Sequence, residues 1–434
     1  MTAPPTPHLL RLRENTTLPA VSLSPDLAAA LRAAARPEQL SISRGWGGGY
    51  DLSAGGVVGV IVLPGRGDDG RGEATGGQIN SDPTKSLPVA SPLHIQIEPK
   101  VPLDNLFYML TYAHELGTFG RDEAPLAAGA SIFDAVAKIF IRQVDDIARR
   151  GIHRGYIEYE EDAAWLRGRL LVGRQARRGP MALGFHQQTN EFTADVLENR
   201  VLRAALELLA RVRFRDPELG PGARRALAAF AEASPGATAA DCDRVVFTRL
   251  NERYRSPINL ARLFLRYLSL EGQSGNTPFV TFLVPMHQLF ERFVARLLRD
   301  HLAGRTRFHL ATQAPIWLDT DQRLKAQPDL VLKYDGRPYL VLDTKYKVYG
   351  DRPTNADIYQ MVTYCHTLGV GRGMLIYPSD APVEEEHQLR AGVRLELRAL
   401  SLAGPLPAFR ARCAAFVSTL IERRESTDFT DSTD

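Results

Sequence analysis

The chain has 434 residues, of which 44% are hydrophobic and 24% are charged. These fractions are typical of folded globular proteins and exclude intrinsic disorder, collagen and coiled coil as the overall class. No apolar run is long enough to cross a membrane, and the N-terminal segment lacks the basic and apolar parts of a signal peptide, so we expect no membrane contact. The formal charge of +3 is too small to indicate a nucleic-acid-binding protein by itself.

Cysteine and lysine are both scarce. The three cysteines are Cys242, Cys365 and Cys413. Their spacing excludes a clustered zinc or iron–sulfur site, and the odd number favours a reducing compartment, so we expect a cytoplasmic protein. Only 7 of the 53 basic residues are lysines, and four of the seven fall within 23 positions. These four are Lys325, Lys333, Lys345 and Lys347.

Residues 1–98 are predicted to form a β-rich module. A short helix is expected at 27–35, and the apolar run 57–63 predicts a buried strand. The strand predicted at 94–98 could pair with it across the glycine-rich segment 64–92, for which we expect a long mobile loop.

Residues 99–275 show helical periodicity, with helices predicted at 197–211 and 260–270 among others. Before the first of these helices, the segment 165–190 has five arginines and no acidic residue. The five are Arg167, Arg169, Arg174, Arg177 and Arg178. Such a stretch is either a solvated face or a surface that contacts DNA phosphates. The region is therefore predicted to be a mainly helical connection with a candidate DNA-contacting segment.

Residues 276–424 predict an α/β domain, followed by a disordered tail at 425–434. A helix is expected at 285–301, with Glu291 at the edge of its apolar face. Strands are predicted at 308–318, 329–333 and 339–346, the last two joined by an Asp-Gly hairpin turn. A helix at 356–368 and a strand at 374–377 complete the order α-β-β-β-α-β. The predicted fold class is thus α+β and multidomain.

Two carboxylates and a lysine are expected to meet in this domain. Side chains alternate along a strand, so Asp343, Lys345 and Lys347 share one face, and Asp329 on the neighbouring antiparallel strand can approach them. Two carboxylates suit a hard divalent cation such as Mg²⁺, and a nearby lysine can stabilise charge during phosphodiester hydrolysis. Taken one at a time, the same residues could equally be ordinary residues at strand ends.

Together these residues resemble the PD-(D/E)xK nuclease superfamily. The resemblance implies that Asp329 and Asp343 bind the metal, that Lys345 is catalytic, and that the Thr344 carbonyl is a further ligand. Glu291 corresponds to the helix acid of many members, although it could also be a charge at a helix border. The family's usual metal is Mg²⁺, for which Mn²⁺ can substitute.

The run 357–364 is similar to the Gln-x-x-x-Tyr element of the RecB-like branch. Gln360 and Tyr364 are one turn apart on one helix face, so both could reach the site or the DNA. The alternative is a core tyrosine beside a surface glutamine.

Further motifs resemble the McrC family, the nuclease subunits of the McrBC modified-cytosine restriction system. They include Ile97-Glu98-Pro99-Lys100, Arg167-Gly168-Arg169 and Asn199-Arg200. The resemblance implies a hexameric AAA+ GTPase partner of the McrB type, which recognises modified double-stranded DNA and is stimulated by the N-terminal part of McrC. No Gly-Lys dipeptide occurs, so we expect no nucleotide to be bound by this chain alone.

Two other functions remain open from the sequence. One is a RecB-like repair nuclease that acts without a motor, and the other is a non-catalytic adaptor that activates a ring NTPase. The module 1–98 is the predicted partner-binding element. How its glycine-rich segment would dock is not indicated by the sequence.

Overall fold

The computed structural model describes residues 8–46, 48–63, 93–116, 131–177, 183–271, 279–347, 353–380 and 383–425. The loop predicted at 64–92, Arg178 and all but the first residue of the predicted tail lie outside these residues. The described helices include none that is long and apolar enough to span a membrane.

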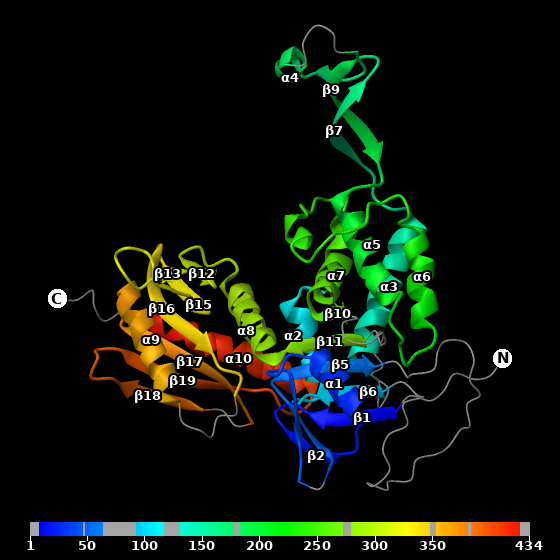
Figure 1. Cartoon of the computed structure of the whole chain (residues 1–434). Helices are drawn as coiled ribbons and strands as arrows, with labels where there is room; N and C mark the ends of the chain where they lie inside the picture. The colour runs from blue at the N-terminus through cyan, green and yellow to red at the C-terminus, as the bar shows by residue number, and fades with distance from the viewer. Residues whose placement is uncertain are drawn as a thin grey trace.

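A five-stranded sheet occupies the centre of the molecule (Figure 1). Its strands lie in the order β1 (His8–Arg13), β6 (Leu93–Glu98), β5 (Val57–Leu63), β11 (Phe279–Pro285) and β10 (Leu268–Glu271). The predicted antiparallel pairing of 57–63 with 94–98 is confirmed. β5 also pairs with β11, more than 200 positions along the chain, so the N-terminal residues share one sheet with residues 268–285.

The rest of the N-terminal part packs against one face of this sheet. A second sheet has the order β2 (Thr17–Val21), β4 (Tyr50–Ala54) and β3 (Leu40–Arg44). Helix α1 (Pro25–Ala34) confirms the predicted helix; it is capped by the Ser24 hydroxyl and buries Leu31 against the strands.

The other face is covered by helices with apolar stripes at the predicted spacing. They are α2 (Leu103–Ala113), α3 (Ile132–Arg150), α5 (Leu197–Leu209), α6 (Leu219–Ala228) and α7 (Arg255–Tyr267), with two short 3-10 turns, η1 (Asp241–Arg244) and η2 (Glu252–Tyr254). The helix predicted at 260–270 was too long at its end, because residues 268–270 belong to strand β10, which pairs with β11.

The arginine-rich segment is not part of the helical layer. It belongs to a three-stranded sheet of β7 (Gly155–Ala163), β9 (Phe185–Thr193) and β8 (Arg169–Leu170), with the short helix α4 (Val172–Arg177). This sheet projects from the helices, away from the rest of the protein (Figure 1). The mainly helical description of 99–275 therefore missed a sheet, because β7 alternates half-buried and exposed residues and has no fully buried face.

The C-terminal part contains a six-stranded sheet. Its order is β12 (Phe308–Thr312), β15 (Leu330–Tyr334), β16 (Arg337–Thr344), β17 (Arg372–Ser379), β19 (Arg394–Ser401) and β18 (Glu384–Gln388). Helices α8 (Met286–Leu302) and α10 (Leu406–Glu425) contribute to the apolar core on one face, and α9 (Asn355–Leu368) packs on the other. The predicted element order is observed, including the hairpin turn between β15 and β16.

The prediction of one continuous strand over 308–318 is wrong. It divides into β12 and a short strand β13 (Ile316–Trp317), which pairs with β14 (Lys325–Ala326) in a small hairpin. Gln313 follows β12 with a positive φ of 51°, and Pro315 has no N–H to donate, so the strand cannot continue.

A buried histidine gives a testable prediction for stability. His114 is only 8% exposed, and burial, followed by the charges of Arg292, Arg262 and Arg266, lowers its pKa to about 3. As pH falls below about 6.5, the unfolded chain binds a proton that the folded chain refuses, so His114 should lower the free energy of unfolding by up to ~1.4 kcal/mol per pH unit. Urea unfolding at pH 7, 6 and 5 should therefore show a weaker pH dependence for His114→Gln than for the wild type. Equal slopes would contradict a buried neutral histidine.

Candidate active site

Asp329 and Asp343 lie side by side at one end of two neighbouring strands. Asp329 immediately precedes β15, Asp343 is the penultimate residue of β16, and Leu330 and Leu342 are directly opposite in the antiparallel register. The backbone N–H and the hydroxyl of Thr344 both donate to Asp329 Oδ2, at 2.8 and 2.9 Å. Two donors therefore fix the Asp329 carboxylate beside Asp343.

Glu291 approaches the same place from helix α8. The amide of Gln313 donates to Glu291 Oε1 and, at 3.4 Å, to Asp329 Oδ1. Gln313 thus connects the helix acid with the first strand acid. Its position depends on the break after β12, which the sequence did not reveal.

Burial and neighbouring carboxylates raise the pKa values of Glu291 and Asp343. Burial, followed by the charge of Asp329, raises the pKa of Glu291 to about 7. The same two causes, in the same order, raise the pKa of Asp343 to about 6, and Asp343 is only 3% exposed. Negative charge is concentrated here beyond what the local cations offset, so a bound cation would stabilise the ionised forms.

Lys345 is the cation nearest to Asp343. Its Nζ lies 2.7 Å from Asp343 Oδ2 and 3.8 Å from Asp357 Oδ1, and it donates to Gln360 Oε1 at 3.0 Å. Burial opposes its charge, but the hydrogen bond that Lys345 donates to Asp343 and the neighbouring carboxylates hold the pKa of Lys345 above its usual value. The ammonium is therefore protonated and fixed by three oxygen atoms at the end of β16.

Gln360 and Tyr364 extend this network. The Gln360 amide donates to the Tyr364 hydroxyl at 2.7 Å, and that hydroxyl lies 3.4 Å from the carbonyl of Gln327. Gln327 in turn donates to the Gln313 carbonyl at 2.7 Å. Tyr364 is buried, as the core alternative expected, yet its hydroxyl faces the exposed Gln360, which contacts Lys345.

The donors present are compatible with a hard divalent cation. Among the described residues, no group of three or more His, Cys, Asp and Glu side chains is arranged to hold a metal by itself. Mg²⁺ needs fewer, because it keeps several water molecules and binds proteins through one or two carboxylates. Asp329 and Asp343 supply two, and burial followed by the charge of Asp329 raises the pKa values of Asp343 and Glu291, which a bound cation would oppose.

The arginine candidates in the described residues are not brought to this cluster, whereas Lys347 is linked to it through Asp357, which also lies 3.8 Å from Lys345. Lys347 forms an ion pair with Asp357, and Arg167 and Arg174 form ion pairs with Glu161 and Glu160 on strand β7. Arg169 and Arg177 are exposed on β8 and α4 of the projecting sheet. Their proposed contact with DNA would therefore take place far from the carboxylates (Figure 1).

A buried glutamate connects the N-terminal sheets to the segment that follows strand β16. Glu14, fully buried just after β1, accepts a hydrogen bond from the Tyr346 hydroxyl at 2.9 Å and one from the Lys100 N–H at 2.7 Å. Tyr346 lies between Lys345 and Lys347. The position of the lysine segment therefore depends on contacts with the N-terminal part.

Comparison with known proteins identifies the family. The family model described as "McrBC 5-methylcytosine restriction system component" matches residues 86–378, more than half of the chain. The chain belongs to this McrBC family. The similarity predicted from the sequence is thus confirmed.

Two relatives of the McrBC family extend the comparison. The chain is 23% identical over 330 residues to the Escherichia coli K12 "Type IV methyl-directed restriction enzyme EcoKMcrBC", covering 67% of this chain and 90% of the relative. Its fold is similar, with a TM-score of 0.53 and 20% identity, to a chain from a half-complex of Thermococcus gammatolerans McrB AAA+ hexamers with bound McrC. That match covers 95% of this chain and all of the other, so the McrBC-type fold extends over both the N-terminal sheets and the C-terminal domain.

Proposed function

We propose that this McrBC-family chain is the Mg²⁺-dependent DNA endonuclease subunit of a restriction complex, with a PD-(D/E)xK nuclease core. The observation that carries the proposal is the cluster of Asp329, Asp343 and Lys345, with Nζ of the lysine 2.7 Å from the second carboxylate. An adaptor without activity would not need the buried Asp343 next to the half-buried Asp329, because burying a carboxylate beside a second negative charge costs folding free energy.

The residues of the cluster have separate roles in this proposal. Asp329 and Asp343, with the Thr344 carbonyl, would hold Mg²⁺, which when bound lowers the pKa of water and neutralises charge on the phosphate. Lys345 holds its proton and places a positive charge where negative charge develops on the phosphate oxygens. Gln360 and Asp357 orient that ammonium, and Gln313 positions Glu291 against Asp329.

The partner and substrate are proposed from the comparisons. The structurally similar complex contains McrB AAA+ hexamers, and the family model is named for 5-methylcytosine restriction. We therefore propose a McrB-like ring GTPase as partner and modified double-stranded DNA as substrate. A RecB-like nuclease that works alone is the alternative, and it would cut without any partner.

Reconstituted cleavage tests this function. The full chain, a McrB-like GTPase, GTP and Mg²⁺ should linearise a methylated plasmid and leave the unmethylated plasmid intact. Cutting of both plasmids without the GTPase would favour the RecB-like alternative. GTP hydrolysis stimulated by the chain, with no cutting of either plasmid, would favour the adaptor.

Two exposed surfaces are candidates for the partner contact. In the predicted module 1–98, Trp46 at the β3–β4 turn is fully exposed. The projecting sheet exposes more apolar residues, including the contacting pair Tyr156 and Phe192, whose rings are 5.1 Å apart. Exposed apolar groups of this size mark protein–protein contacts, so their number favours the projecting sheet over the N-terminal module.

Serine substitutions test the two surfaces one at a time and leave the strands of the central sheet in place. We expect the double variant Tyr156→Ser/Phe192→Ser to reduce stimulation of the partner's GTPase at least ~10-fold, a loss of ~1.4 kcal/mol of binding free energy. Trp46→Ser is the matched variant on the N-terminal module. If Trp46→Ser abolishes stimulation and the double variant does not, the predicted N-terminal module is the partner-binding element.

A further inference from the structure

A cavity opens beside the candidate active site. It has a volume of ≈ 1050 Å³ and lies between helix α1, the junction of α7 with β10, and the first half of α8. Glu291, Gln313 and Gln327 line one part of it, and they also belong to the hydrogen-bonded network around Asp329. The cavity is therefore continuous with the catalytic cluster, while its other end reaches the N-terminal helix.

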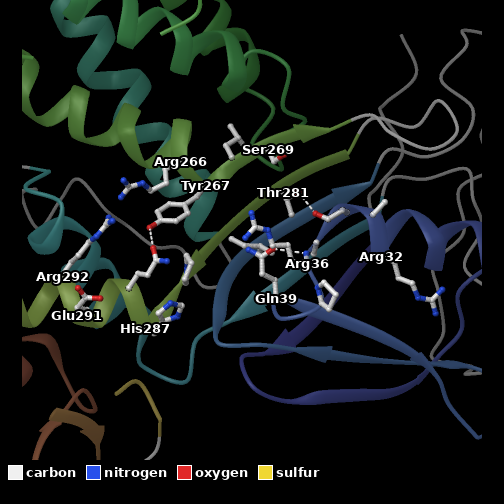
Figure 2. Close-up of a pocket in the computed structure, with 18 of the residues that line it drawn as sticks. Arg32, Arg36, Gln39, Arg266, Tyr267, Ser269, Thr281, His287, Glu291 and Arg292 are labelled. Atoms are coloured by element: carbon white, nitrogen blue, oxygen red, sulfur yellow. Dashed lines mark hydrogen bonds between the residues drawn. The ribbon is translucent and has the colours of Figure 1, made fainter. Parts of the chain in front are cut away.

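Basic side chains from three elements line this cavity. Figure 2 shows Arg292 and Arg266 near Glu291, with Arg36 and Arg32 farther along toward the N-terminal part. Arg32 donates to the carbonyl of Ile42, and Arg36 lies 4.0 Å from Glu38. These two arginines are already engaged by residues of their own module.

Arg266 and Arg292 differ in having no such partner. Neither forms an ion pair or hydrogen bond with another described residue. Arg262, one turn before Arg266, pairs with Asp243 at 3.1 Å and with the Asn259 side chain at 3.1 Å. Two guanidinium groups beside the cavity thus remain available for an anion from outside the chain.

Positive charge is concentrated around these two arginines. Both act on the buried His114, which stays neutral, and Arg262 adds a third positive charge there. A bound anion with several oxygen atoms would offset this positive charge, and guanidinium groups bind phosphate oxygens in a planar, bidentate geometry.

We propose that this cavity binds the phosphodiester backbone of the DNA strand beside the bond to be cut, with Arg266 and Arg292 as phosphate-contacting residues. The proposal rests on the proposed nuclease function, because it places the backbone between the catalytic cluster and the N-terminal part. The hydrogen bond from the Tyr346 hydroxyl to Glu14 joins the segment that carries Lys345 to the N-terminal part. DNA held here would reach Glu291 and Asp329 along the cavity rather than from the projecting sheet.

DNA binding by the full chain tests the assignment. The parent carries Asp343→Asn, so that DNA remains uncut in Mg²⁺, and binding of a short duplex is measured by fluorescence anisotropy from 50 to 200 mM salt. We expect Arg266→Gln and Arg292→Gln each to weaken binding several-fold and to reduce the slope of log Kd against log salt by ~1. Arg266→Lys and Arg292→Lys should retain the slope, because they keep the charge.

Arg390→Gln is the matched control, since Arg390 is exposed near the far edge of the six-stranded sheet. It should bind like the parent. A parent that does not bind DNA, or glutamine variants with the parent's affinity and slope, would overturn the proposal. The proposed function is judged separately, by plasmid cleavage with the wild-type chain in the reconstituted complex.

Discussion

Replacing Lys345 with alanine is expected to lower the rate of DNA cleavage by ~10²–10³-fold while the protein stays folded. Its ammonium is held 2.7 Å from Asp343 and 3.0 Å from Gln360 Oε1, so it is positioned before any substrate binds. The side chain is partly exposed and lies beyond the end of β16, so its loss leaves the core intact. The measurement is single-turnover cleavage of methylated plasmid by the reconstituted complex.

Lys333→Ala provides a matched control for Lys345→Ala. Lys333 lies on the neighbouring strand β15, is similarly half-buried, and belongs to the same lysine-rich stretch. Lys333→Ala should cut at the wild-type rate, and both variants should still stimulate the partner's GTPase. Near wild-type cleavage by Lys345→Ala would remove this lysine from the mechanism.

Removing Mg²⁺ with excess EDTA should abolish cleavage, and Ca²⁺ should not restore it. Asp329 and Asp343 supply two carboxylates, which suits the small, octahedral Mg²⁺ ion, whereas Ca²⁺ takes longer and looser coordination and acidifies water less. Mn²⁺ should substitute for Mg²⁺. The rate is measured over a series of metal concentrations, with GTP turnover followed in parallel because the partner's GTPase has its own need for metal.

Two outcomes would contradict the metal-dependent mechanism. Cleavage in excess EDTA would show that the carboxylates work without a cation. Equal rates in Ca²⁺ and Mg²⁺, at matched GTP turnover, would show that metal geometry has no part in the reaction.

The grouping of the proposed catalytic residues could be predicted from the sequence because these residues are close together in it. Asp329 and Asp343 flank one hairpin, and strand alternation places Lys345 two positions beyond the second carboxylate. The proximity of Gln360 to Tyr364 could be predicted because the two are one helical turn apart, and the hydrogen bond between them is observed. Local rules of strand and helix geometry are sufficient for this part of the site.

Residues that complete the network through distant contacts were missed. Gln313 reaches Glu291 only because β12 ends with a positive φ, and Gln327 is important only through bonds to Gln313 and Tyr364. Asp357 was visible at the start of its helix, but its contacts with two lysines depend on how α9 packs against β16. No periodicity in the sequence encodes such contacts.

The pairing of the N-terminal strands is a second feature that could not be predicted from the sequence. Strand β5 was predicted from its seven consecutive apolar residues, but nothing in that run identifies β11 as its partner. The arginine run likewise suggested a phosphate-binding surface, whereas Arg167 and Arg174 are paired with acids on β7. A charge counted along the sequence is available for binding only if no neighbour in the fold neutralises it.

The most direct test of the central claim is Mn²⁺ binding to the full chain, measured by electron paramagnetic resonance in the wild type and in Asp343→Asn. Asparagine has nearly the same shape as the buried Asp343 but lacks its charge, so the strand should remain in place. The wild type should bind Mn²⁺ at the concentrations that support cleavage, and Asp343→Asn should lose both the binding and the cleavage. Unchanged Mn²⁺ binding by Asp343→Asn, or full cleavage by that variant, would contradict a metal-dependent nuclease site at Asp329, Asp343 and Lys345.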